Sequence, residues 1–303
     1  MRSFVMRVVV IAVIIGTLAV APVSAAQNYD IAIMNGRVID PETMLDATRN
    51  VGIRDGRIAV ITNKKISGKE TIDATGLVVA PGFIDTQFHG IDPFATKMAL
   101  RDGMTSGLDL EVGIFRTKDW YDKKAHEGWQ VNYGATAGLA QIRMTVHDPE
   151  VKFKEHEPVD FNNIFPRYIN EAAKDGVPGW SITRSTIEQM NRIMKKLDEE
   201  LQQGAIGVGV GAAYMARGLE SYEQFEAQRV AARYGRLTDV HLRYHGNTQT
   251  PIESPISFDE VFANAVLLDA PLLVAHDNNY GWWEIEEKLQ MARAKGLNMW
   301  GEY

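Results

Sequence analysis

The sequence predicts an α/β protein: a TIM-type (β/α) barrel that is incomplete at its C-terminal end and preceded by a small β-sandwich. Residues 29–80 carry the alternating pattern of antiparallel strands, whereas short apolar strands alternate with amphipathic helices from Gly82 onward. The chain of 303 residues, 45% of them hydrophobic, is long enough for one barrel-type domain. The last predicted strand ends just before Tyr303, and it is only the seventh, whereas a closed barrel of this type has eight.

The first 26 residues have the three parts of a signal peptide. Arg2 and Arg7 form the positive part, residues 8–20 are an almost uninterrupted apolar run, and small residues follow at the cleavage positions. A membrane span needs roughly 20 apolar residues, so the run is too short to be an anchor. We therefore expect cleavage after Ala25 or Ala26 and a periplasmic or secreted protein without a membrane segment.

Residues 27–81 are expected to form the β-sandwich. Asn35-Gly36 and Asp55-Gly56 each stand between alternating apolar runs, which is a strong hairpin signal. Short strands are expected at residues 71–73 and 77–80.

The barrel domain is expected to span residues 82–303. Its strands are predicted at residues 83–86, 106–110, 131–137, 206–210, 238–242, 272–275 and 297–301. The clearest helices are predicted at residues 186–202, 222–234, 257–268 and 283–295. Residues 138–184 contain four prolines and little periodicity, so we expect a long inserted loop over the barrel mouth.

Composition excludes several classes of function. The chain has no cysteine, so disulfides, thiolate metal ligands and a lipoprotein anchor are excluded. The net charge is −7, and removal of Arg2 and Arg7 with the leader makes it −7 − 2 = −9. An acidic chain without a basic run is not expected to bind nucleic acid.

Polar side chains stand where the predicted barrel strands end, which is where such barrels carry their sites. Gln87 and His89 follow the first strand, and residues two apart in an extended chain point the same way. Glu111 ends the second strand, His241 the fifth and His276 the sixth. Three histidines and a carboxylate at one mouth form a donor set suited to Zn²⁺.

The alternative for each of these histidines is a hydrogen-bonded structural residue, and it is their convergence that favours a metal site. The other four histidines are expected in loops and solvated: His126, His147, His156 and His245. For Asp109, packing against a helix is the alternative to a role in the site.

The first-strand sequence Ala80-Pro-Gly-Phe-Ile-Asp-Thr86, with its x-aromatic-His end, resembles the signature of the metal-dependent amidohydrolase superfamily. Further segments resemble the D-aminoacylase branch, which contains N-acyl-D-amino-acid and N-acyl-D-glutamate deacylases. They are Gly103-Met-Thr-Ser106, Gly204-Ala-Ile-Gly-Val208, Tyr234-Gly235, His241-Leu-Arg243 and the strand that ends at His276. The resemblance covers roughly residues 29–303.

The resemblance implies hydrolysis of a non-peptide amide C–N bond, above all deacylation of N-acyl-D-amino acids by a metal-activated water. It implies one or two Zn²⁺ ions, with His89 and Glu111 as ligands and with His241 and His276 on the more tightly held ion. Gln87 stands where the family has a histidine. Because an amide oxygen is a weaker zinc ligand than imidazole, this departure favours a mononuclear site.

Two residues are candidates for contacts with a small-molecule substrate, an N-acyl-amino acid. Arg243 lies two residues beyond His241 and would pair with a substrate carboxylate; a surface salt bridge is the alternative. Tyr214 follows the fourth strand; a packed loop aromatic is its alternative. The family's eighth strand supplies a catalytic Asp, which is expected beyond Tyr303 in a longer reading frame.

Two other functions stay open. The first is a catalytically silent amidohydrolase-like binding protein, suggested by Gln87 and by the absent eighth-strand Asp. The second is a cyclic-amide hydrolase similar to dihydroorotase or hydantoinase. Those relatives commonly use a carboxylated lysine on the fourth strand, and residues 206–210 contain no lysine.

Overall fold

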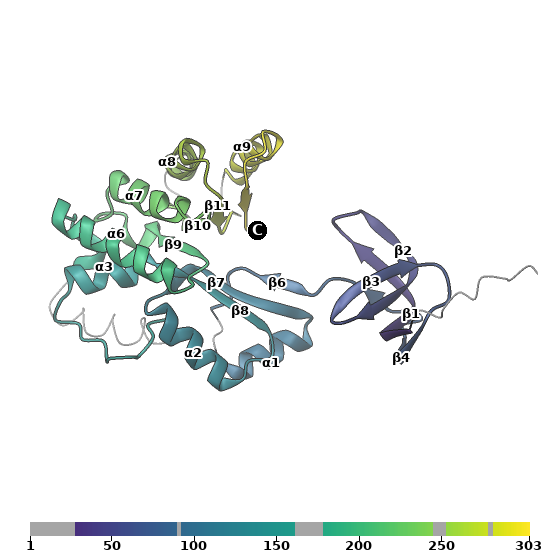
Figure 1. Ribbon diagram of the computed structural model, residues 1–303. Coiled ribbons are helices and arrows are strands. Elements are labelled where there is room, and N and C mark those ends of the chain that lie inside the picture. Colours follow the sequence, from purple (N-terminus) through teal and green to yellow (C-terminus); the bar gives the residue numbers. More distant parts are fainter. Residues whose placement is uncertain (1–27, 90–91, 161–177, 245–252, 278–280) are drawn as a thin grey trace, which may run out of the picture. The chain divides into compact units, whose positions relative to one another are not determined.

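The computed structural model describes residues 28–89, 92–160, 178–244, 253–277 and 281–303. The chain divides into two compact units, residues 1–81 and 82–303 (Figure 1). The predicted signal peptide lies outside the described residues. Within the described residues, no helix has both the length and the apolar character that crossing a bilayer requires.

The first unit contains one five-stranded sheet with the order β3-β2-β1-β4, and β5 also pairs with β1. Its strands are β1 (Asn28–Asp40), β2 (Leu45–Arg54), β3 (Arg57–Thr62), β4 (Ser67–Asp73) and β5 (Val78–Val79). Strand β2 pairs antiparallel with both β1 and β3, whereas β4 and β5 run parallel to β1. The β character of this segment is as predicted, and its arrangement as a sandwich stays a prediction.

One of the two predicted hairpin turns in this unit is confirmed. Asp55 and Gly56 both have positive φ, at 52° and 69°, and join β2 to β3. The turn predicted at Asn35-Gly36 is wrong, because β1 continues through it and the register with β2 shifts there. Asn35 has a φ of 63° and its backbone N–H donates to the Asn50 side chain, so the pair forms an irregularity within the strand.

The second unit contains a seven-stranded sheet in sequence order, β6-β7-β8-β9-β10-β11-β12, in which all neighbours are parallel. The strands are β6 (Phe83–Asp85), β7 (Met104–Ile114), β8 (Asn132–Gly138), β9 (Gly207–Gly211), β10 (Leu237–His241), β11 (Leu272–Ala275) and β12 (Met299–Gly301). A parallel sheet with helices between successive strands fits the predicted TIM-type barrel. That the barrel is incomplete stays a prediction.

The helices of this unit include all four that the sequence predicts. The helices described in this unit are α1 (Pro93–Arg101), α2 (Thr117–Glu127), α3 (Leu139–His147), α5 (Gly179–Ile182), α6 (Ile187–Gln202), α7 (Ser221–Ala232), α8 (Glu253–Leu268) and α9 (Trp282–Ala294), with the short 3₁₀ helix η1 (Ala212–Met215) after β9. The four predicted helices correspond to α6, α7, α8 and α9. Helix α6 begins with a capping box between Thr186 and Gln189, and its Ile193 and Leu197 lie in the same core cluster as Val208 of β9.

The inserted loop predicted at residues 138–184 is wrong in part. Residues 139–147 form α3 and residues 179–182 form α5, while residues 161–177 lie outside the described part. Helix α3 escaped prediction because it is buried on most sides. Its polar residues Gln141 and Arg143 are fully buried, so no polar face marks the helix in the sequence.

A cavity of about 780 Å³ lies between the two edge strands of the second sheet, β6 and β12. Its wall includes apolar side chains that are largely exposed, among them Phe83 at 66%, Trp300 at 54% and Tyr303 at 66%. Glu302 also lines it.

Candidate metal centre

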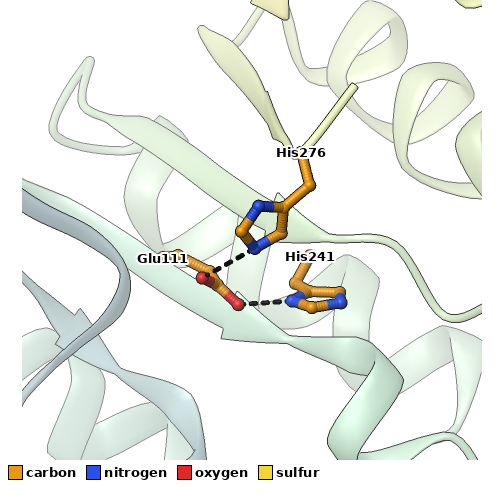
Figure 2. A group of neighbouring side chains, drawn as sticks. All are labelled: Glu111, His241 and His276. Carbon is orange, nitrogen blue, oxygen red and sulfur yellow. Dashed lines mark hydrogen bonds and ion pairs between the residues drawn. The ribbon is translucent and has the colours of Figure 1, made fainter. Parts of the chain in front are cut away.

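Three side chains from separate strands converge in the second unit: Glu111 from β7, His241 at the end of β10 and His276 directly after β11 (Figure 2). Each offers one ligand atom, and these atoms all lie within 4.8 Å of one another. The convergence follows from topology, because the parallel strands of one sheet all end at the same edge.

The Glu111 carboxylate is the centre of this group. Its Oε1 lies 2.5 Å from His241 Nδ1, and its Oε2 lies 3.2 Å from His276 Nε2. The Glu111 side chain is only 2% exposed, and an ionised carboxylate at such burial requires a cation or hydrogen-bond donors. Two imidazole nitrogens and one carboxylate oxygen are donors that Zn²⁺ accepts, so these residues fit a divalent metal ion.

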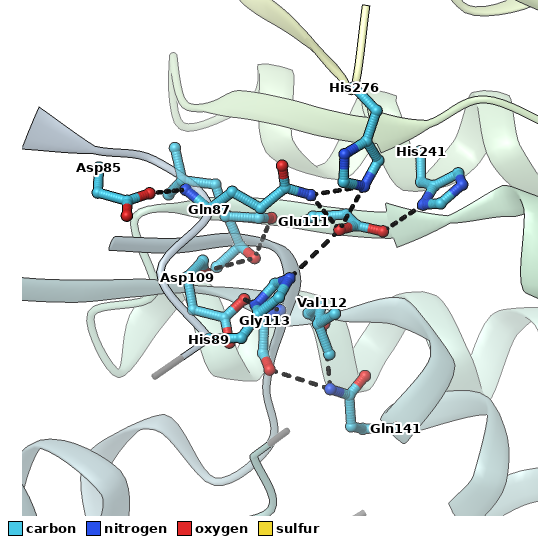
Figure 3. A network of polar contacts seen from close by, with 12 residues as sticks. Asp85, Gln87, His89, Asp109, Glu111, Val112, Gly113, Gln141, His241 and His276 are labelled. Atoms are coloured by element: carbon cyan, nitrogen blue, oxygen red, sulfur yellow. Dashed lines mark hydrogen bonds and ion pairs between the residues drawn. The ribbon is translucent and has the colours of Figure 1, made fainter. Parts of the chain in front are cut away.

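The backbone around Glu111 is held by buried polar contacts (Figure 3). Gln141 of α3 donates from Nε2 to the carbonyls of Val112 and Gly113, at 3.0 Å each. The Gly113 N–H donates to Asp109 Oδ1 at 3.0 Å. Gly113 has a φ of 68°, and a Cβ there would lie 2.5 Å from Thr136 Oγ1, so only glycine fits.

Gln87 and His89 lie beside this group, as the sequence predicts for side chains that follow the first strand (Figure 3). Gln87 Nε2 donates to Glu111 Oε2 and lies 2.7 Å from His276 Nε2. His89 Nε2 lies 3.4 Å from Glu111 Oε2, and His89 Nδ1 lies 3.3 Å from Asp109 Oδ1. The structure thus brings together all five predicted metal-site residues, and it adds Asp109 to their surroundings.

The carboxylates and imidazoles shift one another's protonation. Burial alone would raise the pKa of Glu111, but its contacts with three histidines outweigh burial and hold the pKa well below its usual range. Burial opposes the charged form of His89, yet its contacts with Asp109 and Glu111 raise the pKa to about 10. Glu111 is therefore the permanent negative charge of the centre.

His276 has an unusual backbone conformation, with a φ of 55°. A non-glycine residue in the left-handed region is uncommon and costs about 1–2 kcal/mol. Strain of this kind at a site residue is typical of functional positions.

Arg243 does not have the free donors that its predicted substrate contact requires. Its Nε and one terminal nitrogen hold the two carboxylate oxygens of Glu260 at 3.0 and 2.9 Å. Its other contacts are with the carbonyls of Ala216 and Leu219 and the side chain of Gln224. Five donor contacts match the five N–H groups of a guanidinium, so Arg243 ties β10 to its neighbours instead of facing a substrate.

Tyr214 lies in η1 beside the centre, as its predicted substrate contact requires. Its ring stands edge-on to His241 with the centroids 5.0 Å apart, and the residue is 45% exposed. Burial of the hydroxyl and, to a smaller degree, the charge of Glu111 raise the pKa of Tyr214. The phenol therefore stays protonated at neutral pH and is able to donate a hydrogen bond.

Two further carboxylates near the centre were not among the predicted site residues. Asp239 is fully buried, and burial, with Glu302 and Glu111 as negative neighbours, raises its pKa well above the usual value. Burial also raises the pKa of Glu302, which follows β12. Asp239 was detectable in the sequence, because it is two residues before His241 on the same strand face.

The other four histidines differ in how exposed they are. His126 and His156 are exposed, as predicted, but His126 lies in helix α2 and not in a loop. His147 is not solvated as predicted, because its Nε2 lies 2.9 Å from the Ser185 hydroxyl and the side chain is partly buried. His245 lies outside the described residues.

Comparison with sequences of known proteins gives relatives but no matching family model. The D-aminoacylase of Alcaligenes xylosoxydans xylosoxydans is 24% identical over 271 residues, which are 85% of this chain and 52% of that protein. The dihydroorotase of Streptococcus pneumoniae is 44% identical over 86 residues, which are 28% of this chain and 20% of that protein. The chain thus spans about half the length of the D-aminoacylase that it matches.

Solved structures show the same fold. The N-acyl-D-glutamate deacylase of Bordetella bronchiseptica, solved with zinc and a phosphonate inhibitor, superposes with a TM-score of 0.67 at 19% identity. The match covers 91% of this chain and 58% of that one. The chain is a relative of the metal-dependent amidohydrolases. Within them it resembles the D-aminoacylase branch, as the sequence motifs predict.

Proposed function

We propose that this protein hydrolyses a non-peptide amide bond with the help of a divalent metal ion, most simply Zn²⁺, held by Glu111, His241 and His276. The observation that supports this most directly is the convergence of these three side chains, whose ligand atoms lie within 4.8 Å of one another around a buried carboxylate. A bound ion supplies two things in such a reaction: it polarises the amide carbonyl and it lowers the pKa of water.

The chain's own residues have defined tasks in this proposal. Glu111 keeps its negative charge and places its two oxygens beside the ring nitrogens of His241 and His276. Tyr214 lies against His241 with a protonated, half-exposed phenol, and we assign it a hydrogen bond to the substrate. No general base is assigned among the described residues; the resemblance implies one on an eighth strand.

We propose N-acyl-D-amino acids as the substrates. The match to D-aminoacylase supports this choice, since it extends over 85% of the chain. A cyclic amide is the second candidate, supported by the dihydroorotase match. The deacylase is favoured because β9, with the sequence Gly-Val-Gly-Val-Gly, carries no lysine ligand, while Glu111 of β7 reaches the two histidines instead.

The experiment is to measure zinc content and hydrolysis on the same preparation of the purified chain. N-acetyl-D-amino acids, their L-enantiomers, dihydroorotate and hydantoin are the substrates to compare. We expect bound zinc and turnover of the D-enantiomers. Turnover of the cyclic amides alone would favour the second candidate. Tight binding of an N-acetyl-D-amino acid without turnover would support a silent binding protein, and a chain without zinc would contradict the metal centre.

We also propose that the protein is exported after cleavage of residues 1–26. The N-terminal sequence of the protein isolated from its native source tests this. A start at Ala26 or Gln27 is the expected result, and a retained Met1 would contradict it.

A further inference from the structure

We propose that Gln87 competes with the metal ion for its ligands, so that the side-chain amide of this residue sets the affinity of the centre. This inference rests on the proposed metal-dependent function and concerns the same site. It begins from the position of the Gln87 amide, which contacts both Glu111 and His276 (Figure 3).

The chemistry of these contacts fixes the direction of each hydrogen bond. An amide nitrogen only donates, so the Gln87 Nε2 that lies 2.7 Å from His276 Nε2 requires the imidazole nitrogen to accept. The lone pair of His276 Nε2 is then used by the amide, and this is the same lone pair that would bind a metal ion. The second amide hydrogen goes to Glu111 Oε2.

The two N–H donors of the Gln87 amide thus stabilise Glu111 Oε2 and His276 Nε2, as a bound cation would. Glu111 Oε2 and His276 Nε2 lie 3.2 Å apart, and both are acceptors when the imidazole accepts from Gln87. Two acceptors at this distance repel each other unless a cation or a double donor neutralises them. The opposite amide orientation would turn the carbonyl oxygen toward the carboxylate, so the donor orientation is the favourable one while no ion is bound.

The competition predicts a measurable cost of metal binding. An ion that engages Glu111 and His276 must first displace two hydrogen bonds, one of them to a charged group. Methionine has nearly the same shape as glutamine and no donor, so Gln87→Met removes the competitor and leaves the packing in place. We expect Gln87→Met to bind Zn²⁺ at least about tenfold more tightly than the wild type, given the usual strength of hydrogen bonds to charged groups.

The test is a zinc titration of the full chain against a chromophoric chelator, which reports affinity and stoichiometry without using activity. Gln202→Met is the matched control, because Gln202 is an exposed residue at the end of α6 whose amide contacts Asp198. Far-UV circular dichroism verifies that each variant is folded. Tighter binding by Gln87→Met than by the wild type and by Gln202→Met supports the competition.

Two results would overturn the inference, and they have different meanings. If the wild type binds zinc and Gln87→Met binds equally or more weakly, the competition is disproved while the metal centre stands. Weaker binding would identify Gln87 as a ligand. If neither folded protein binds zinc, the competition and the proposed function fail together.

Discussion

At the scale of single residues, the centre depends on Glu111, whose one carboxylate faces His241, His276, His89 and Gln87. Glu111→Gln keeps the shape and removes the charge. We expect it to weaken zinc binding by at least a hundredfold, since a charged ligand is replaced by a weak neutral one. Equilibrium dialysis with metal analysis measures the loss.

The control for this variant is Glu150→Gln, because Glu150 is an exposed carboxylate in the same unit. We expect it to bind zinc as the wild type does. If Glu111→Gln retained the affinity of Glu150→Gln, the ion would have to lie elsewhere.

The sequence predicts the residues of the centre well because the position of a strand end is a local property. Gln87, His89, Glu111, His241 and His276 all follow from that one rule. Arg243 obeys the same rule, but its contacts favour the alternative, a salt bridge, over the substrate contact. Its donors are used by acceptors 17 to 27 residues away, and no local pattern reveals such partners.

At the scale of elements, helix α3 is fixed by a buried ion pair. Arg143 donates from one terminal nitrogen to Glu223 of α7, and both side chains are fully buried. Its other N–H groups donate to the carbonyls of Trp180 and Thr183 and to the Ser185 hydroxyl. Arg143 therefore joins α3 both to α7 and to the segment around α5.

Replacement of this arginine should destabilise the second unit strongly. Arg143→Met leaves Glu223 buried without its cation, and the loss of one partner of such a pair typically costs about 3–5 kcal/mol. Urea unfolding followed by circular dichroism measures the change. We expect the double variant Arg143→Met with Glu223→Leu to recover part of the loss. Equal stability of the single variant and the wild type would contradict the role of the pair.

His147, at the end of α3, predicts a specific pH dependence. Burial and, to a lesser extent, the charge of Arg143 lower its pKa to about 4, whereas an unfolded histidine titrates near 6.5. The folded protein therefore binds this proton less readily than the unfolded chain. The stability that neutral His147 contributes is present above about pH 6.5 and is lost as the pH falls toward 4.

Melting temperatures measured between pH 7 and pH 4 test this dependence. We expect His147→Gln to lose less stability over this range than the wild type, by an amount on the order of 1 kcal/mol for a partly exposed group. His126→Gln is the control, because His126 is exposed in α2, and it should follow the wild type. Identical profiles for His147→Gln and the wild type would contradict the prediction.

A helix could be predicted from the sequence where it has one apolar face and one polar face. Helix α6 has one apolar face and was predicted to within a residue, whereas α3 is buried on most sides and was missed. The hairpin turn at Asp55-Gly56 could be predicted because its conformation depends on residues that are adjacent in the sequence. The Asn35-Gly36 irregularity depends on Asn50 and Val79, which are distant in sequence.

At the scale of the whole molecule, the edges of the seven-stranded sheet predict self-association. Strands β6 and β12 are edge strands beside a cavity with exposed Phe83, Trp300 and Tyr303. Exposed apolar groups along open strand edges favour contacts with other chains. We expect the 303-residue chain, purified by itself, to associate at about micromolar concentrations in sedimentation velocity experiments.

Charged substitutions at these edges should reduce the association. Phe83→Lys with Trp300→Lys is expected to shift the population toward monomers. The control is Leu267→Lys in α8, because Leu267 is 76% exposed and does not line the cavity. If Leu267→Lys increased the monomer fraction as much as the double variant does, the strand edges would not be the surfaces that associate.

The order of the strands in this sheet could be predicted, because alternation of strands and helices produces parallel neighbours in sequence order. The arrangement of the first unit could not be predicted to the same depth. Its strands β4 and β5 both pair with β1 across more than 30 residues, and alternation alone does not select such partners.

The left-handed conformation of His276 has a consequence for the history of the protein. Glycine would adopt this backbone more readily, so a histidine at this position carries a local conformational cost. In a lineage released from selection for metal binding, substitutions at this position would be favoured by stability alone. We therefore expect His276 to be present in descendants that kept the chemistry and to be replaced in those that kept only the fold.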